Sequence, residues 1–263
     1  MGFGASVLLK AFGPNSFRDG CSLSIYRQIR LFEISRSALF TQPTLLSQAG
    51  WLLHDEVYLT RDHGLLDIVF DLFLQCSMLS QRFVGRYFRE RNRLLILFLV
   101  SNRSNTYTES TDSDPTTVFE LVQEGKALRS RLVVFSSFLC KNTQALDISM
   151  AWIYYYAVSI YLSGIFDYTL IGVCDSTGIS LTDEQLTVHV EGILRWSEES
   201  LRHNQVSHVF LLIPLRIAGN RCSNSKQCQG VLKRLEILQG QFAVATAFRT
   251  ELLQLWSSRS LHV

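Results

Sequence analysis

The stretch that decides the fold runs from Met150 to Ile165 and reads Met-Ala-Trp-Ile-Tyr-Tyr-Tyr-Ala-Val-Ser-Ile-Tyr-Leu-Ser-Gly-Ile. It is the longest apolar run in the chain, and Asp147 and Asp167 flank it. Its length of about 16 residues is short of the roughly 20 that a bilayer-crossing helix needs. A helix that is apolar on all sides is buried in a protein core or in a membrane. The sequence therefore predicts a buried core helix here.

Helical periodicity extends outward from this run. Apolar residues recur at steps of three and four from Leu23 to Leu39, opposite a basic face, and Pro43 should end that helix. Thr182 and Gln185 form a capping box that should open another. Further helices are expected at about 65–100, 118–140, 145–173, 182–203, 205–220, 226–239 and 242–256. Since no window alternates like a strand, we predict an all-α fold of about seven to eight helices, stacked as antiparallel hairpins.

The whole chain, residues 1–263, is expected to form a single helical domain. Hydrophobic residues make up 47% and charged residues 18%, a composition that excludes an intrinsically disordered protein. Residues 101–117 break the pattern, because they consist mainly of Ser, Thr, Asn and Asp and cannot bury apolar surface. We expect a flexible loop there.

Charge and spacing point away from several classes of site. The formal net charge is only +2, so no basic surplus indicates nucleic acid. The six cysteines contain no C-x-x-C pair, and the histidines lack metal-ligand spacing, so we expect free, buried thiols and neither a metal nor a cofactor. Four arginines form a stripe on one predicted helix, which suits a solvated face or an acidic neighbour as well as nucleic acid. These are Arg82, Arg86, Arg89 and Arg93.

An aromatic group within the core run is the candidate ligand site. Trp152, Tyr154, Tyr155 and Tyr156 could line a pocket for a flat apolar ligand. The alternative is core packing, with the hydroxyl groups hydrogen-bonded to polar partners.

Catalytic residues are not assigned by any motif. The sequence has no G-x-S-x-G, P-loop or G-x-G-x-x-G pattern. His54, Asp55 and His63 could perform acid–base chemistry, although a polar loop between helices explains them equally simply.

Several stretches carry a family resemblance. Gly4 to Phe17 follows the pattern GA-x-x-LL-x-x-x-GP-x-x-F. The similarity continues, in the same order, through residues 29–39, residues 42–47, Trp51, Asp67-Ile68, residues 151–156, residues 193–199 and residues 209–218. Together these stretches resemble the helical region of the fungal zinc-binuclear-cluster transcription factors, which follows their DNA-binding head.

The resemblance implies an all-helical regulatory region. Its roles in the family are restraint of activation, response to a metabolite and contact with partners. The family's head holds two zinc ions on six cysteines in C-x-x-C halves, and this sequence starts at Met1 without it. We therefore do not expect zinc-mediated reading of DNA, whether the chain is a shortened gene product or a fragment of a longer factor.

The expected function follows from the resemblance. It is regulation of transcription in fungal secondary metabolism, in the nucleus or alternatively in the cytoplasm, without direct contact to nucleic acid or membrane. The expected partners are the transcription machinery or another transcription factor, with a small-molecule effector as a further candidate. One alternative is a cofactor-independent enzyme of a fungal secondary-metabolite pathway on the same scaffold, and another is a helical scaffold that binds no ligand.

Overall fold

The computed structural model describes residues 7, 9–11, 13, 20–48, 51, 64–100, 118–142, 148–167, 178–203 and 208–259, with side chains omitted at 20–23, 86–100, 118 and 203. The α-helices of these ranges are α2 (Gly20–Phe40), α3 (Leu65–Val100), α4 (Val118–Lys141), α5 (Ile148–Phe166), α6 (Asp183–His203), α7 (Leu212–Asn220), α8 (Ser225–Gln239) and α9 (Ala243–Ser258). Two 3-10 helices, η2 (Leu45–Ser47) and η5 (His208–Leu211), join them. No strand occurs in the described residues, so the predicted all-α class is confirmed.

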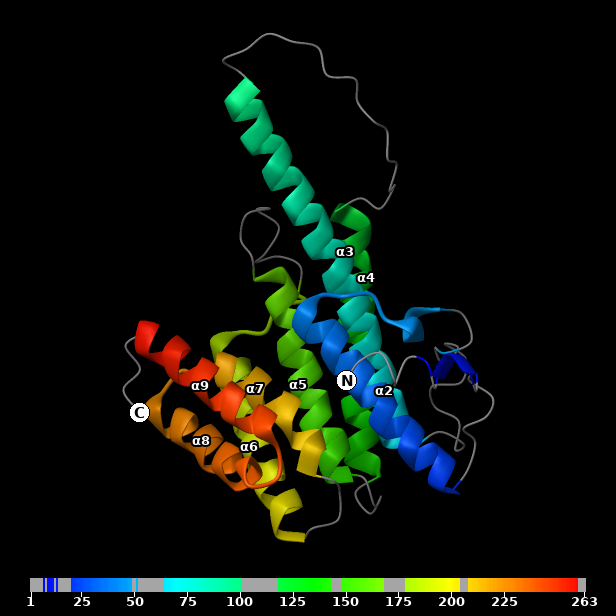
Figure 1. Ribbon diagram of the computed structural model, residues 1–263, viewed down its shortest axis with the longest axis vertical. Coiled ribbons are helices and arrows are strands. Elements are labelled where there is room, and N and C mark those ends of the chain that lie inside the picture. The colour runs from blue at the N-terminus through cyan, green and yellow to red at the C-terminus, as the bar shows by residue number, and fades with distance from the viewer. Residues whose placement is uncertain are drawn as a thin grey trace.

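Helix α5 lies at the centre of the fold, as the core-helix prediction requires (Figure 1). It contacts α3 and α4, and also α6 and α7. Most of its residues from Met150 to Phe166 are buried, on all sides of the helix. By length and composition it is the one helix of the described ranges that could cross a membrane, but here other helices cover it. The predicted range of 145–173 was too long, because the helix ends before Asp167.

The other helices pack around α5 in chain order. Each consecutive pair from α2 and α3 onward through α8 and α9 is in contact, as stacked hairpins require. The second half of α3 extends past its neighbours toward the top of Figure 1. The C-terminal hairpin is anchored by Trp256, which is fully buried and donates its indole N–H to the carbonyl of Gly219 on α7 at 2.8 Å.

Buried ion pairs join α2 to α3. Arg30 Nη2 donates to Asp71 Oδ1 at 2.7 Å, and the two side chains are only 3% and 0% exposed. One turn away, Arg27 donates from Nε and Nη2 to the carboxylate of Asp67 at 3.1 and 2.5 Å. Arg27 and Arg30, on the basic face that the sequence predicts for α2, therefore point toward acidic residues of α3, and these pairs fix the register of the two helices.

The polar contacts continue from α3 to α4. The second carboxylate oxygen of Asp71 accepts from Gln75 Nε2 at 3.0 Å. Gln75 Oε1 in turn accepts from Arg131 Nη1 at 2.7 Å. One chain of hydrogen bonds thus links three helices, from the buried Arg30–Asp71 pair to the partly buried Gln75 and Arg131.

The segment that follows α2 is held by two side chains of that helix. Arg36 donates to Gln42 Oε1 at 2.7 Å and to the carbonyl of Pro43 at 3.0 Å. Glu33, which is buried, accepts from Arg36 at 3.0 Å and from Thr44 Oγ1 at 3.3 Å. The helix ends at Phe40, close before Pro43, as the sequence predicts.

The capping box that the sequence predicts at the start of α6 is confirmed. The backbone N–H of Thr182 donates to Gln185 Oε1 at 3.0 Å. The backbone N–H of Gln185 donates to Thr182 Oγ1 at 3.3 Å. Two of the N–H groups that have no partner within the helix are satisfied in this way.

Replacing Asp71 by Asn should be strongly destabilising. The substitution removes the closer carboxylate of the buried, charged Arg30 and leaves only that of Asp67, at 3.9 Å. Breaking a buried ion pair typically lowers the free energy of unfolding by about 3–5 kcal/mol. Urea unfolding measures the change. The matched control is Arg202→Gln, which breaks an exposed ion pair to Glu198 and should change stability by less than about 1 kcal/mol. Equal effects of the two substitutions would contradict the role given to the buried pair.

Gly192 of α6 lies against α5, because a Cβ atom there would lie 2.5 Å from the ring of Tyr156. Replacing Gly192 by Ala should therefore lower the free energy of unfolding by about 1–3 kcal/mol, despite the better helix propensity of Ala. At Gly85, on the exposed side of α3, a Cβ atom meets nothing within 4 Å. Gly85→Ala should accordingly raise stability by about 0.5–1 kcal/mol. Thermal and urea unfolding of both variants check the opposite signs.

Candidate functional site

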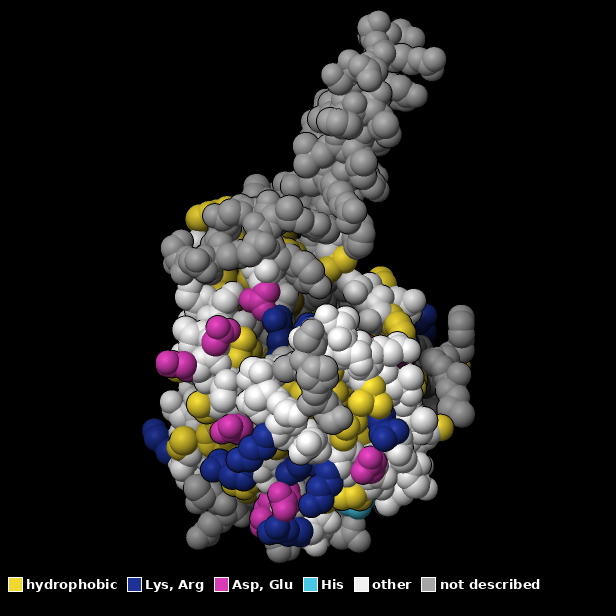
Figure 2. Space-filling model, turned by 90° about the vertical axis from the view of Figure 1, so that its left-hand side faces the viewer, with side chains coloured by type: hydrophobic (Ala, Val, Ile, Leu, Met, Phe, Trp, Pro, Cys, Tyr) yellow, Lys and Arg dark blue, Asp and Glu magenta, His cyan; other side chains and the backbone are white. Residues whose placement is uncertain are grey.

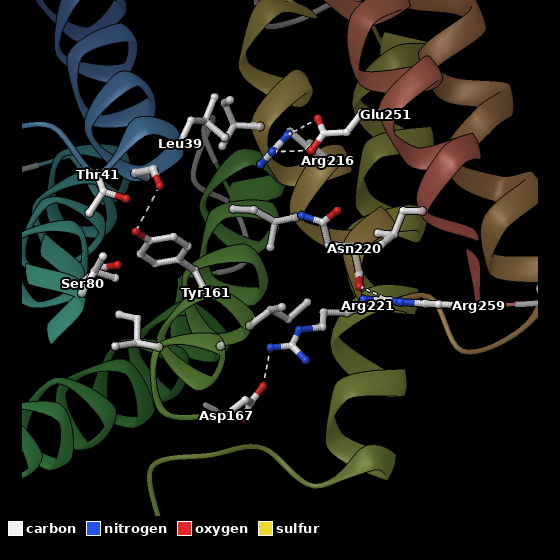
Figure 3. Close-up of a pocket in the computed structure, with 18 residues that line it drawn as sticks. Leu39, Thr41, Ser80, Tyr161, Asp167, Arg216, Asn220, Arg221, Glu251 and Arg259 are labelled. Atoms are coloured by element: carbon white, nitrogen blue, oxygen red, sulfur yellow. Dashed lines mark hydrogen bonds and ion pairs between the residues drawn. The ribbon is translucent and has the colours of Figure 1, made fainter. Parts of the chain in front are cut away.

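A cavity of about 600 Å³ opens among α2, α3, α5, α7 and α9 (Figure 3). We call it the arginine cavity. Its apolar wall consists of Ala38, Leu39, Val84, Ile160, Ile165, Ile213, Ile217 and Leu255. Its polar lining consists of Thr41, Ser80, Tyr161, Asp167, Arg216, Asn220, Arg221, Glu251 and Arg259. The volume lies within the range of about 300–1,000 Å³ that is usual for small-molecule pockets.

The three arginines of the cavity are held in different ways. Arg216 donates from Nε and Nη2 to both carboxylate oxygens of Glu251, at 2.9 and 2.6 Å, and its guanidinium lies over the ring of Phe248. Arg221 reaches from α7 to Asp167 at the end of α5 through Nη2 alone. Figure 3 shows both pairs at the cavity wall.

Arg259, the third arginine, has one hydrogen bond and leaves other N–H donors of its guanidinium free. Arg259 Nη1 donates to the carbonyl of Asn220 at 2.8 Å. Asn220 is the residue before Arg221, and the side chains of Arg221 and Arg259 both line the cavity. Within the described residues, only one nitrogen of each group has a hydrogen-bond partner. Three arginines face two carboxylates in the lining, so the lining carries one net positive charge.

A glycine makes room for Arg221. At Gly164 of α5, a Cβ atom would lie 2.9 Å from Arg221 Nη2. The missing side chain lets the guanidinium lie against the backbone of the helix. The α5 sequence thus shapes the cavity as well as the core.

Tyr161 contributes its phenol ring and hydroxyl oxygen to the cavity lining. Its hydroxyl donates to the carbonyl of Ala38 at 3.3 Å, and its ring packs edge-on against Phe73. Burial raises the pKa of Tyr161 to about 12. The hydroxyl therefore stays protonated at neutral pH, which does not suit a general base.

The aromatic residues predicted as a ligand site point in two directions. Tyr154 is fully buried, packs edge-on against Phe70 and donates its hydroxyl to the carbonyl of Phe210 at 2.7 Å. This is the core-packing arrangement that the sequence left open for it. Burial raises the pKa of Tyr154, which keeps it a donor.

Trp152, Tyr155 and Tyr156 instead face α6. The ring of Trp152 stacks on Tyr156 and on Trp196, with centroids 5.5 and 6.5 Å apart. Tyr155 packs edge-on against Trp152 at 5.5 Å. Trp152, Tyr156 and Trp196, with Cys140, Ile148 and Arg195, line a second cavity of about 340 Å³. A flat ligand at this place stays a prediction.

His189 of α6 closes the other side of this aromatic group. Its ring lies 5.1 Å from that of Tyr156, edge to face, and 5.8 Å from that of Tyr155. Nδ1 donates to the carbonyl of Gln185 at 2.7 Å. Burial lowers the pKa of His189, and the charge of Arg129 acts in the same direction, whereas the Gln185 carbonyl opposes it.

Because of His189, the free energy of unfolding should decrease as the pH decreases below about 6.5. The folded protein keeps His189 neutral below its ordinary pKa of 6.5, while the unfolded chain takes up the proton. Its contribution is therefore complete above pH 6.5 and is lost as the pH falls toward the lower, folded pKa. Urea unfolding followed by tryptophan fluorescence should show a steeper loss for the wild type than for His189→Gln. Identical pH profiles would contradict this assignment.

The remaining sequence predictions have mixed outcomes. His54, Asp55, His63 and the predicted loop at 101–117 lie outside the described residues. Arg82 of the arginine stripe forms an ion pair with Glu124 of α4, the acidic neighbour that the sequence allowed. Arg86, Arg89 and Arg93 lie on α3, but their side chains are outside the description.

The cysteines are free where the structure describes them. Cys76, Cys222 and Cys228 are buried, as predicted. Cys140 is exposed, so the prediction of a buried thiol was wrong there, because it lies near the end of α4 beside the inward-facing Leu139. Burial raises the pKa of Cys76 to about 12, which makes it unreactive. The described residues contain no group of three or more metal-ligating side chains.

Comparison with known proteins does not assign the chain to a family. No protein-family model matches the chain, and neither a curated protein nor a solved structure does. The function must therefore be argued from the site and from the motifs.

The arginine cavity is the feature that sequence reasoning missed. Arg216 lies within the 209–218 motif, and Asp167 was noted as a flank of the core run. Nothing in the sequence indicates that these residues meet Glu251 and Arg259, which come from α9 and the residue after it. The short spacing between Arg216 on α7 and Arg221 directly after that helix is the local signal that the sequence offers.

Proposed function

We propose that this chain is a regulator of transcription that resembles the helical region of fungal zinc-binuclear-cluster factors. It acts through contact with another transcription factor or the transcription machinery and responds to a small metabolite. It works in the nucleus, with the cytoplasm as the alternative, and in secondary metabolism.

The positions of the resembling stretches support this proposal. Residues 29–39 lie on α2, and Asp67 lies on α3. Arg27, which comes two residues before the first of these stretches, forms an ion pair with Asp67. The later stretches, at 151–156, 193–199 and 209–218, lie on α5, on α6 and on η5 with α7. These three helices contact one another. Motifs that are scattered along the chain therefore form one connected framework.

The observation that carries the small-molecule part is the arginine cavity. It combines an apolar wall with a few convergent polar groups, the arrangement usual for ligand sites. It also lies where α2, α5, α7 and α9 meet, so an occupant touches segments from both ends of the chain. A ligand there could bias the packing of helices that a protein partner contacts.

The surface that Figure 2 shows agrees with a protein-binding role better than with a nucleic-acid-binding one. On this side, where α8 and α9 lie, basic and acidic side chains are interspersed. Arg249 pairs with Glu236, and Arg234 pairs with Glu198. A nucleic-acid surface would instead gather charges of one sign.

The enzyme alternative has less support from the described residues. Both carboxylates of the arginine cavity, Asp167 and Glu251, are paired with arginines. Tyr161 is held protonated by burial. None of these groups is placed as a general base.

Deletion of the gene in the fungus that encodes it tests the proposal. If the chain is a regulator, transcripts of a whole set of biosynthetic genes should change together by at least severalfold. If it is an enzyme, one intermediate should accumulate while those transcripts stay at their normal level. Sequencing of RNA and profiling of products in the same cultures separate the two outcomes. Reintroduction of the wild-type gene is the control.

A further inference from the structure

We propose that the arginine cavity binds an amphipathic organic acid, whose carboxylate meets Arg221 and Arg259 and whose apolar body lies against the isoleucines of α5 and α7. This inference rests on the small-molecule part of the proposed function and names the chemical class of the ligand.

The choice of an anion follows from the donors at one end of the cavity. Arg221 contacts Asp167 through a single nitrogen, and Arg259 contacts the Asn220 carbonyl through a single nitrogen. The planar guanidinium groups therefore retain N–H donors that can bind a carboxylate in pairs. The net positive lining disfavours a cationic ligand, while a neutral one leaves these donors unused.

The choice of an apolar body follows from the apolar part of the lining. Ile160 and Ile165 of α5 face the cavity together with Ile213 and Ile217 of α7. Leu255 of α9 adds to this surface. An apolar group that is buried here and the wall that it contacts both lose exposure to water, which favours binding. A small inorganic anion would leave this wall unused.

Asp167 already pairs with Arg221, so it competes with the ligand carboxylate for that guanidinium. Asp167 and Arg221 are each about one-third exposed, at 30% and 31%, so the pair can exchange partners at little cost. Arg216 differs, because Glu251 holds it through two hydrogen bonds and Phe248 stacks beneath it. The end of the cavity at Arg221 is therefore the adaptable one, and Asp167 competes with an incoming acid.

Three matched probes test the ligand class on the full-length protein. 1-Naphthaleneacetate, 2-(1-naphthyl)ethanol and 2-(1-naphthyl)ethylamine share one apolar body and differ in charge. Isothermal titration calorimetry and ligand-observed NMR should show binding of the acid, at least tenfold weaker binding of the alcohol and none of the amine. Failure of the acid to bind at millimolar concentration overturns the proposal, and so does equal binding of all three probes.

Two substitutions with opposite expected signs place the acid in this cavity. Arg221→Gln should weaken binding of 1-naphthaleneacetate about tenfold, since it removes the main donor. Asp167→Asn should tighten binding severalfold, because it removes the competing carboxylate and leaves Arg221 in place. Arg202→Gln, which removes an exposed arginine on α6, is the matched control and should leave the affinity unchanged.

The opposite signs keep the test independent of stability. A purely structural role of the pair would weaken binding in both variants, and that result overturns the proposal, as does an unchanged affinity in both. Failure of these binding experiments would not decide the proposed function, since a regulator that acts by protein contact still changes the transcripts measured in the deletion strain.

Discussion

The burial of α5 is the constraint on which the rest of the structure depends. Its run from Met150 to Ile165 is apolar on all sides, so one neighbouring helix could not cover it. It packs against α3 and α4, which precede it in the chain, and against α6 and α7, which follow it. Tyr161 adds a hydrogen bond to Ala38 of α2. The cost of leaving this surface in water decides the architecture.

The neighbours of α5 are positioned by polar contacts that the apolar core cannot provide. Hydrophobic burial is non-directional, so it allows helices to slide or rotate. The pairs of Arg30 with Asp71 and of Arg27 with Asp67 permit one register of α2 on α3.

The arginine cavity arises where packing around α5 is incomplete. Gly164 leaves space on the helix surface, and Arg221 fills part of it while it pairs with Asp167. Charged groups that line an apolar hollow are expensive to keep unless they are paired or bind something. The charged lining therefore makes the arginine cavity a better candidate for ligand binding than the aromatic group between α5 and α6. The rings of that group mainly pack against one another.

The sequence by itself determined the elements, because helix periodicity, the Thr182–Gln185 capping box and Pro43 act through neighbours a few residues away. It also determined that α5 is a core helix, since a run without a polar face has no exposed alternative except a membrane. Only the tertiary structure decided that Tyr154 turns into the core while Trp152 and Tyr156 face α6. It likewise decided that Asp167, Arg221 and Arg259 share one cavity. Contacts between residues far apart in the sequence depend on the angles at which the helices cross. Side-chain packing over the entire chain sets those angles.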